Sequence, residues 1–366
     1  MAPYTGIPLS PAELSYLHTS LAQSPPIRPD GRGATQFRLL VAETDILPTT
    51  NGSARICFPD GTEAIVGVKA EVEKSKGAES AMGEAGAGTT RHDRKDPARG
   101  VEDEDSARAG QGRDEWVEIA IDIPGTRDDD ALPVFLSAML TEALLADGGL
   151  RDSLWINSRF HWRLYIDILL LSQPLSYPLP LLSLTTHLAL LSTRLPSLIS
   201  EKDEDPLFND DWEASTPLYP QPQHRKPPIT LLVMSVGPTI LFDPSADELA
   251  VADAVVAISV ATQSSSSASP ATNPLKVIAL RTIDPPSRLT APGIPSALHT
   301  TPGATSNHSL SPAEAMSVRE KDAGQSVWRP PRGGVKRDVL SGMIKEVVKE
   351  GGVGREVLEG LARVET

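Results

Sequence analysis

Three acidic side chains in the segment FDPSADEL are the residues best spaced to do chemistry. Asp243, Asp247 and Glu248 lie within six consecutive positions, and carboxylates this close could hold a divalent metal ion or act as an acid–base pair. The same pattern is typical of a turn followed by a helix N-terminus, where the helix dipole favours acidic residues by about 0.3–1 kcal/mol. We favour this structural interpretation and expect no metal and no cofactor.

A second expected site is the connection between a strand and a helix. The apolar run FHWRLYIDILLL, which starts at Phe160, predicts a buried strand. The 3-4-3-4 spacing of five leucines predicts a helix with one apolar face: Leu181, Leu184, Leu188, Leu191 and Leu195. Such a connection often holds a phosphate, but here it reads SQPLSYPLP. It has no glycine, lysine or arginine, and its three prolines lack an N–H donor. The anion-binding chemistry is therefore missing.

Other reactive side chains favour structural interpretations. His161 and His187 fall in different expected elements and have no third ligand at metal spacing. Asp167 lies in an apolar strand, so it needs a partner or a solvent-facing position. Cys57 is the only cysteine, which excludes an internal disulfide and a cysteine-rich zinc site, and we expect it to be a small core or half-buried apolar residue. No GxSxG nucleophile motif occurs.

Composition limits the function classes. The chain has 366 residues, 40% hydrophobic content and a net charge of −14. Seven acidic side chains and one lysine lie between Glu201 and Glu213, so the rest is only mildly acidic. This balance argues against gripping nucleic acid through a basic face alone. We see no secretory pattern at the N-terminus and no apolar run free of prolines and charges that could span a membrane, so we expect an intracellular protein.

Hydrophobic periodicity predicts the elements that position these residues. SPAELSYLHTSL predicts a first helix with a capping box at Ser10 and Glu13. FRLLVAETDIL, NGSARICF and TEAIVGVKAEVE predict an antiparallel meander of three strands. WVEIAIDI predicts another strand, and 130–147 predicts a helix. The expected buried face of that helix comprises Leu132, Phe135, Leu136, Met139, Leu140, Ala143 and Leu144.

Hydrophobic periodicity also predicts strands and a helix in the second half of the sequence. ITLLVMS, TILF, AVVAISVA and LKVIALR predict four strands, and a closing helix runs from Val335 to a break at Gly351. Residues 74–113 and 284–334 are poor in large apolar side chains, so we predict two disordered insertions there, with a flexible loop at 262–274. The whole is an α+β layout, with helices packed on mixed and antiparallel sheets.

With the insertions set aside, the sequence resembles the ribonuclease PH family, and within it the non-catalytic ring subunits of the eukaryotic RNA exosome. The resemblance rests on LSPAELSYLHTSL with PPIRPDGR, on FRLLVAETDILPTTNGSARICFPDGTEAIVGVKAEVE, on WRLYIDILLL with LLSLTTHLALLSTRLP, and on VGPTILFDPSADE. It covers nearly all of the chain that we expect to be ordered.

The resemblance implies a ribonuclease PH-like two-layer fold with disordered insertions. The implied divisions are an N-terminal helix extension at 1–27, a first domain at 28–200, an acidic loop at 201–228 and a second domain at 229–366. Active family members attack the 3′-terminal RNA linkage with phosphate, using a glycine-rich, arginine-bearing loop and two acidic residues. In this chain that loop is SQPLSYPLP, and Asp243 matches the first acidic position whereas Leu249 stands at the second.

The resemblance also suggests partners and contacts. It implies a hetero-hexameric ring of ribonuclease PH-like subunits, cap subunits of the S1 and KH types, an associated nuclease and single-stranded RNA in the channel. Arg28, Arg32 and Arg55 are then candidates for contacts with RNA phosphates, and Lys69 and Arg194 are weaker ones. A solvated turn arginine or an ion pair at a subunit interface is an equally good interpretation of each.

The sequence therefore predicts a non-catalytic structural subunit of the exosome core ring, which is not an enzyme. It supports 3′-to-5′ RNA processing and degradation, in ribosomal RNA maturation and messenger RNA turnover. We expect it in the nucleus, with the nucleolus, and in the cytoplasm. The alternatives are an active phosphorolytic 3′-exoribonuclease, a neighbouring non-catalytic ring subunit, and an α+β interaction module outside the exosome.

Overall fold

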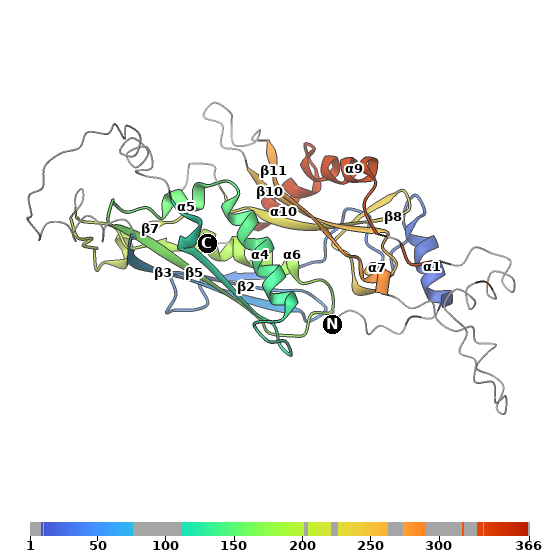
Figure 1. Ribbon diagram of the computed structural model, residues 1–366, viewed down its shortest axis with the longest axis horizontal. Helices are drawn as coiled ribbons and strands as arrows, with labels where there is room; N and C mark the ends of the chain where they lie inside the picture. The colour runs from blue at the N-terminus through green and yellow to red at the C-terminus, as the bar shows by residue number, and fades with distance from the viewer. Residues whose placement is uncertain are drawn as a thin grey trace, which may run out of the picture.

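The computed structural model describes residues 9, 11–75, 112–200, 204–220, 226–262, 274–289, 317, 328–331 and 333–364. Two β-sheets form its framework, with helices between and beside them (Figure 1). The first sheet has the strand order β1-β2-β3-β5-β4, and the second has the order β11-β10-β8-β9. The α+β class, with mixed and antiparallel sheets and packed helices, is confirmed. In the described part of the chain, no helix is long and apolar enough to cross a lipid bilayer.

The first sheet begins with the predicted meander. Its strands are β1 (Val41–Thr44), β2 (Gly52–Cys57), β3 (Glu63–Lys74), β4 (Val117–Asp122) and β5 (Phe160–Leu170). β1, β2 and β3 pair antiparallel in sequence order, which confirms the meander. β5 pairs antiparallel with β3 and parallel with β4. The parallel pair requires a crossover, which α4 (Ala131–Leu145) and α5 (Gly149–Ser153) supply.

The second sheet is wholly antiparallel. Its strands are β8 (Ile229–Val236), β9 (Thr239–Phe242), β10 (Ala254–Thr262) and β11 (Leu275–Ile283). The remaining helices and short elements are α1 (Pro11–Leu21), η1 (Asp114–Trp116), β6 (Arg194–Leu195), η2 (Trp212–Ala214), β7 (Thr216–Pro217), α7 (Ala246–Leu249), η4 (Pro286–Leu289), α9 (Arg337–Val348) and α10 (Val353–Leu361).

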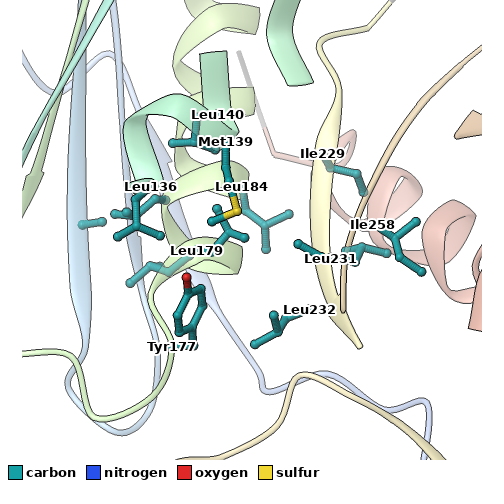
Figure 2. Packing of buried hydrophobic residues seen from close by; sticks show 14 of the residues in the cluster. Leu136, Met139, Leu140, Tyr177, Leu179, Leu184, Ile229, Leu231, Leu232 and Ile258 are labelled. Atoms are coloured by element: carbon teal, nitrogen blue, oxygen red, sulfur yellow. The ribbon is translucent and has the colours of Figure 1, made fainter. Parts of the chain in front are cut away.

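Helix α6 (Leu179–Ser192) lies between the two sheets, with contacts to β2 and β3 on one side and to β8 on the other. Figure 2 shows side chains of α4 and α6 packed together in this layer beside β8, whereas Ile258 of β10 lies on the other side of β8. Gly52 permits the close approach of β2 to the end of α6, because a Cβ there would lie 2.5 Å from Cα of Thr193. The core of the molecule is thus a helical layer held between two sheets.

Several sequence expectations need correction. α6 ends at Ser192, and Leu195 lies in β6 instead of on the helix. The helix is buried on nearly all sides, so its leucines do not mark a single face. Phe135 is 40% exposed although it was expected on the buried face of α4. The strand expected across FRLLVAETDIL is only Val41–Thr44.

The predicted insertions and boundaries have mixed outcomes. Most of 74–113, of 262–274 and of 284–334 lies outside the described residues, as does Ser10 of the expected capping box. Within 284–334, however, Trp328 is buried in the core and its backbone N–H donates to Ser15 Oγ at 3.3 Å. The prediction of disorder is therefore wrong for this residue. The domain boundaries at 27, 200 and 228 stay a prediction.

Candidate functional site

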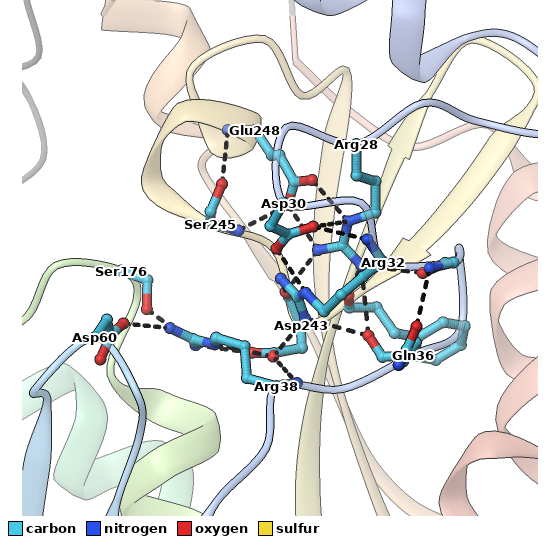
Figure 3. Close-up of polar contacts among 12 residues, drawn as sticks. Arg28, Asp30, Arg32, Gln36, Arg38, Asp60, Ser176, Asp243, Ser245 and Glu248 are labelled. Atoms are coloured by element: carbon cyan, nitrogen blue, oxygen red, sulfur yellow. Dashed lines mark hydrogen bonds and ion pairs between the residues drawn. The ribbon is translucent and has the colours of Figure 1, made fainter.

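A cluster of arginines and carboxylates joins the N-terminal segment to the second sheet (Figure 3). Arg28, Arg32 and Arg38 come from the chain between α1 and β1, and meet Asp243 and Glu248 from the β9–α7 region. Gly31, at φ +74°, provides the tight turn that sends both Arg28 and Arg32 toward β9. We call these residues, with Asp30, Asp60 and Ser176, the arginine–carboxylate cluster.

Arg28 and Glu248 form the buried centre of this cluster. Both side chains are fully buried, and Nε and Nη2 of Arg28 each donate to the carboxylate at 2.7 Å. The guanidinium also donates to the carbonyls of Phe242 and Asp243, at 3.0 and 2.9 Å. Glu248 is held by a capping box, in which it accepts from the N–H of Ser245 at 2.8 Å. Arg28 thus has no exposed donor for another ligand.

Asp243 is the second anchor, and its backbone is left-handed at φ +47°. Few residues other than glycine adopt this conformation, although Asp does so more readily than most. The carboxylate accepts from Arg32 Nη1 at 2.8 Å, and from Nη2 and Nε of Arg38 at 2.8 and 3.0 Å. It also accepts from the backbone N–H of Arg38 at 2.9 Å. These bonds hold the turn after β9 against the N-terminal segment.

Arg38 extends the cluster to the first sheet. Its Nη1 donates to Asp60 at 2.7 Å, and its Nη2 donates to Ser176 Oγ at 3.1 Å. The guanidinium also lies 4.3 Å from the centroid of the Phe58 ring. Burial opposes its charge, but the hydrogen bonds and charges of Asp243 and Asp60 prevail and raise the pKa of Arg38. One side chain therefore connects β9, the β2–β3 turn and the β5–α6 connection.

Asp30 and Arg32 form the outer rim of the cluster. Arg32 Nε donates to Asp30 Oδ2 at 2.6 Å, and the Arg32 side chain is 10% exposed. Burial alone would raise the pKa of Asp30, but the hydrogen bonds from Arg32 and the charges of Arg32 and Arg28 lower it. The rim carboxylate is consequently ionised at neutral pH.

The charges of this cluster are satisfied internally. Three guanidinium groups face four carboxylates, from Asp30, Asp60, Asp243 and Glu248. A phosphate would need donors that are not already used, and the guanidinium of Arg38 already binds Ser176 Oγ of the β5–α6 connection. The geometry therefore suits a rigid joint between the two halves of the fold better than an anion site.

The three acidic residues of FDPSADEL are separated by this arrangement. Asp243 and Glu248 each pair with arginines, and Asp247 lies in the first turn of α7. The turn and helix N-terminus predicted for this segment is confirmed by the capping box. In the ranges that the structure describes, no group of three or more His, Cys, Asp or Glu side chains could hold a metal ion.

Sequence reasoning found two arginines of the cluster but missed Arg38, Asp60 and Ser176. Arg38 stands in the apolar run FRLLV, which predicts only a strand, and Asp60 lies between two predicted strands in a segment with no functional pattern. A partial signal was available for Arg38, because a charged side chain beside buried apolar residues needs an ionic partner. No local pattern could identify Asp243 as that partner, since 205 positions separate the two residues.

The other predicted contact residues lie elsewhere. Arg55, on β2, is 40% exposed and pairs with Glu63 and Glu43. Lys69 on β3 pairs with Glu71, and Arg194 donates to the side chain and carbonyl of Ser215. The RNA-contact prediction stays a prediction for Arg28, Arg32 and Arg55, although the complete burial of Arg28 disfavours it for that residue.

The remaining candidates have structural surroundings. Asp167 is exposed, which confirms its expected solvent-facing position, and Cys57 is half-buried as expected. His161 stacks on Trp116 with ring centroids 4.3 Å apart. His187 is fully buried, with Nδ1 2.7 Å from the carbonyl oxygen of Pro227. Burial lowers the pKa of His187 to about 4, so the ring is neutral at neutral pH.

Comparison with known proteins gives relatives of clear similarity, among them two exosome complex components. The exosome complex component RRP42 of Saccharomyces cerevisiae is 33% identical over 251 residues, which cover 67% of this chain and 78% of that protein. The exosome complex component rrp42 of Schizosaccharomyces pombe is 30% identical over 269 residues, with 69% and 78% covered. No family model matches the chain.

The similarity of the chain to solved structures is weaker than its similarity to these two proteins. For the structure described as Archaeoglobus fulgidus exosome with RNA bound to the active site, the TM-score is 0.47 and the identity 18%, covering 75% of this chain and 87% of that one. For an archaeal exosome core, the TM-score is 0.47 and the identity 17%, with 85% and 96% covered.

Proposed function

The chain belongs to the family of the exosome complex component RRP42, and from that premise we propose that it is a non-catalytic subunit of the exosome core ring. Its role is to assemble the ring and to help guide RNA toward an associated nuclease, in 3′-to-5′ RNA processing and degradation. The subunit contributes to the shape and continuity of the ring and does not itself cleave RNA.

The closed arginine–carboxylate cluster is the observation that supports a non-catalytic role. Each of its three guanidinium groups already binds a carboxylate of this chain. The β5–α6 connection, where the family resemblance places a phosphate-binding loop, offers no Lys, Arg or Gly. A phosphate nucleophile would have to displace ion pairs that are largely buried, at a cost of several kcal/mol for the Arg28–Glu248 pair.

The proposed partners follow from the family. We expect other ribonuclease PH-like subunits on both sides in a hetero-hexameric ring, cap subunits of the S1 and KH types, a separate nuclease and single-stranded RNA. The proposed location is the nucleus, including the nucleolus, and the cytoplasm. Among the predicted RNA contacts we retain Arg32, because its side chain is 10% exposed at the rim of the cluster whereas that of Arg28 is fully buried.

Gentle affinity purification of the tagged full-length chain from its own cells tests the assembly. We expect a particle with five other ribonuclease PH-like subunits in equal amounts, measured by native mass spectrometry. Recovery of the chain as a monomer or homo-oligomer would contradict the ring role.

A phosphorolysis assay on the purified chain tests the non-catalytic assignment. With a 3′-hydroxyl RNA and inorganic phosphate, we expect no nucleoside diphosphate above a no-protein control. Phosphate-dependent release of nucleoside diphosphates would support the alternative, an active phosphorolytic exoribonuclease.

A further inference from the structure

The five-stranded sheet has one covered face and one open face. Alternate residues of its strands pack on α6, among them Ile56, Val66 and Ile166, which are fully buried. The residues between them point the other way, where the β1–β2 loop covers Ser53 and Gly67 with Leu47 and Thr50, and no helix in the described ranges lies over the remainder (Figure 1). We call the side of the sheet that points away from α6 the open face.

Strand register places an apolar area at one end of the open face. In one cross-strand row Val41 lies opposite Cys57, and in the next Ile65 lies opposite Leu169. Leu171 follows Leu169 by two residues and therefore extends the same side of β5. Leu39 stands two residues before Val41. These apolar side chains are exposed to an unusual degree, at 81% for Leu39, 66% for Val41, 40% for Leu169 and 46% for Leu171.

A groove continues this area around the edge of the sheet. It has a volume of about 740 Å³ and is lined by Leu169 and Asp167 of β5, Asp122 of β4 and Val134 of α4, among others. β1 and β4 are the two edge strands of the sheet, so exposed apolar side chains and the groove occur toward both edges, with the Arg55–Glu63 pair between them. Exposed apolar surface of this extent is typical of a protein contact site.

The charges beside the area indicate the chemistry of the occupant. Glu43, Arg55 and Glu63 lie within it, because Arg55 stands between Glu43 and Ile65 in one row and Glu63 stands opposite Cys57 in the other. Asp122 borders the area on β4, and Arg55 is already paired with both glutamates. The net negative charge repels RNA phosphates and repels a second copy of the same face. It favours a protein surface with an apolar centre and Lys or Arg at its rim.

We propose that the apolar end of the open face, with the groove beside β4, is the contact surface for a neighbouring ring subunit that has a basic rim. This inference rests on the proposed ring function and adds to it the surface that makes the contact. Arg55 then belongs to a protein interface, where it keeps two carboxylates compatible with the apolar contact, and it does not bind RNA.

The opposite end of the same face supplies an internal control. There Lys69 pairs with Glu71, and Arg163 pairs with Glu73 and Glu118, so the surface is charged and well solvated. A glutamate introduced at position 69 alters the same sheet face without touching the apolar area. The double variant Val41→Glu with Leu169→Glu instead places two charges in the proposed contact.

The experiment compares tagged full-length wild type, the double variant and Lys69→Glu, each purified from its own cells. We expect the double variant to recover sibling ring subunits at a level reduced by roughly tenfold or more, because burying unpaired charges in an interface is costly. Lys69→Glu should recover them within about twofold of wild type. Thermal unfolding of the three isolated chains should agree closely, since each position is exposed.

Three outcomes separate the possibilities. Recovery of siblings by the double variant at the wild-type level would overturn the proposed surface while leaving the ring function intact. Failure of the wild type to recover siblings would contradict the ring function itself. If light scattering shows that the isolated wild-type chain forms a homodimer that the double variant loses, the contact belongs to a second copy and the assignment to a different subunit is wrong.

Discussion

The arginine–carboxylate cluster and the open face of the first sheet use polar and apolar groups in opposite ways. In the cluster, charges are buried and each guanidinium is satisfied within the chain. On the open face, apolar side chains such as Leu39 and Val41 are exposed and have no counterpart among the described residues. The difference indicates that the cluster is complete within the monomer, whereas the face requires another molecule. Variants in the cluster should therefore affect stability, and variants on the face should affect assembly.

The largest effect is expected from Glu248→Ala. Removal of this carboxylate leaves the fully buried guanidinium of Arg28 without its bidentate partner. Breaking one side of a buried ion pair costs about 3–5 kcal/mol of unfolding free energy. Denaturant unfolding of the purified chain measures the loss. The matched control is Asp247→Ala, one position away in the same helical turn, which should change stability by less than about 0.5 kcal/mol.

Equal unfolding free energies for Glu248→Ala and Asp247→Ala would contradict this expectation. They would mean that the Arg28–Glu248 pair does not hold the joint, and that the bonds of Arg32 and Arg38 to Asp243 and the apolar contacts attach the N-terminal segment. A double replacement of Arg28→Met with Glu248→Leu refines the test. It should recover part of the loss, because neither charge then remains buried without a partner.

An intermediate effect is expected from His187 in the helical layer. Its folded-state pKa, about 4, lies below the ordinary value of 6.5 because of burial. Below pH 6.5 the unfolded chain binds a proton that the folded chain does not, so stability falls as pH decreases from about 6.5 to about 4 and levels off below that. The loss at the lower limit is on the order of 3 kcal/mol.

Unfolding free energies measured between pH 7.5 and 4 check this dependence. In His187→Gln the part of the pH dependence that belongs to the imidazole should disappear, whatever the variant's absolute stability. His18, which lies 3.8 Å from Asp253 and is one-third exposed, supplies the control substitution His18→Gln. An unchanged pH profile in His187→Gln would show that this ring titrates normally and is not closed off from water.

The two regions also differ in how far the sequence could predict them. The alternating pattern of NGSARICF and TEAIVGVKAEVE predicted the meander, and through it which residues share a sheet face. The helix after Leu179 was predicted as well, but its burial between two sheets was not. A helix that is apolar on all sides has no single apolar face to indicate which element packs against it. Arg28 and Glu248 are 220 positions apart, so their pairing depends on the tertiary fold and leaves no local signal.

The smallest effect on stability is expected from Arg55→Ala. This variant tests most directly whether the open face contacts protein or RNA. The guanidinium is exposed, Glu43 is 53% exposed, and removal of Arg55 opens the 19% exposed Glu63 side chain to water. The change in unfolding free energy should fall within the roughly 10–15% uncertainty of the extrapolation. RNA crosslinking to the assembled particle should also be unchanged, whereas Arg32→Ala, at the rim of the cluster, should reduce it. If Arg55→Ala instead weakens crosslinking, the open face lies toward RNA, and its exposed leucines would need an explanation other than a subunit contact.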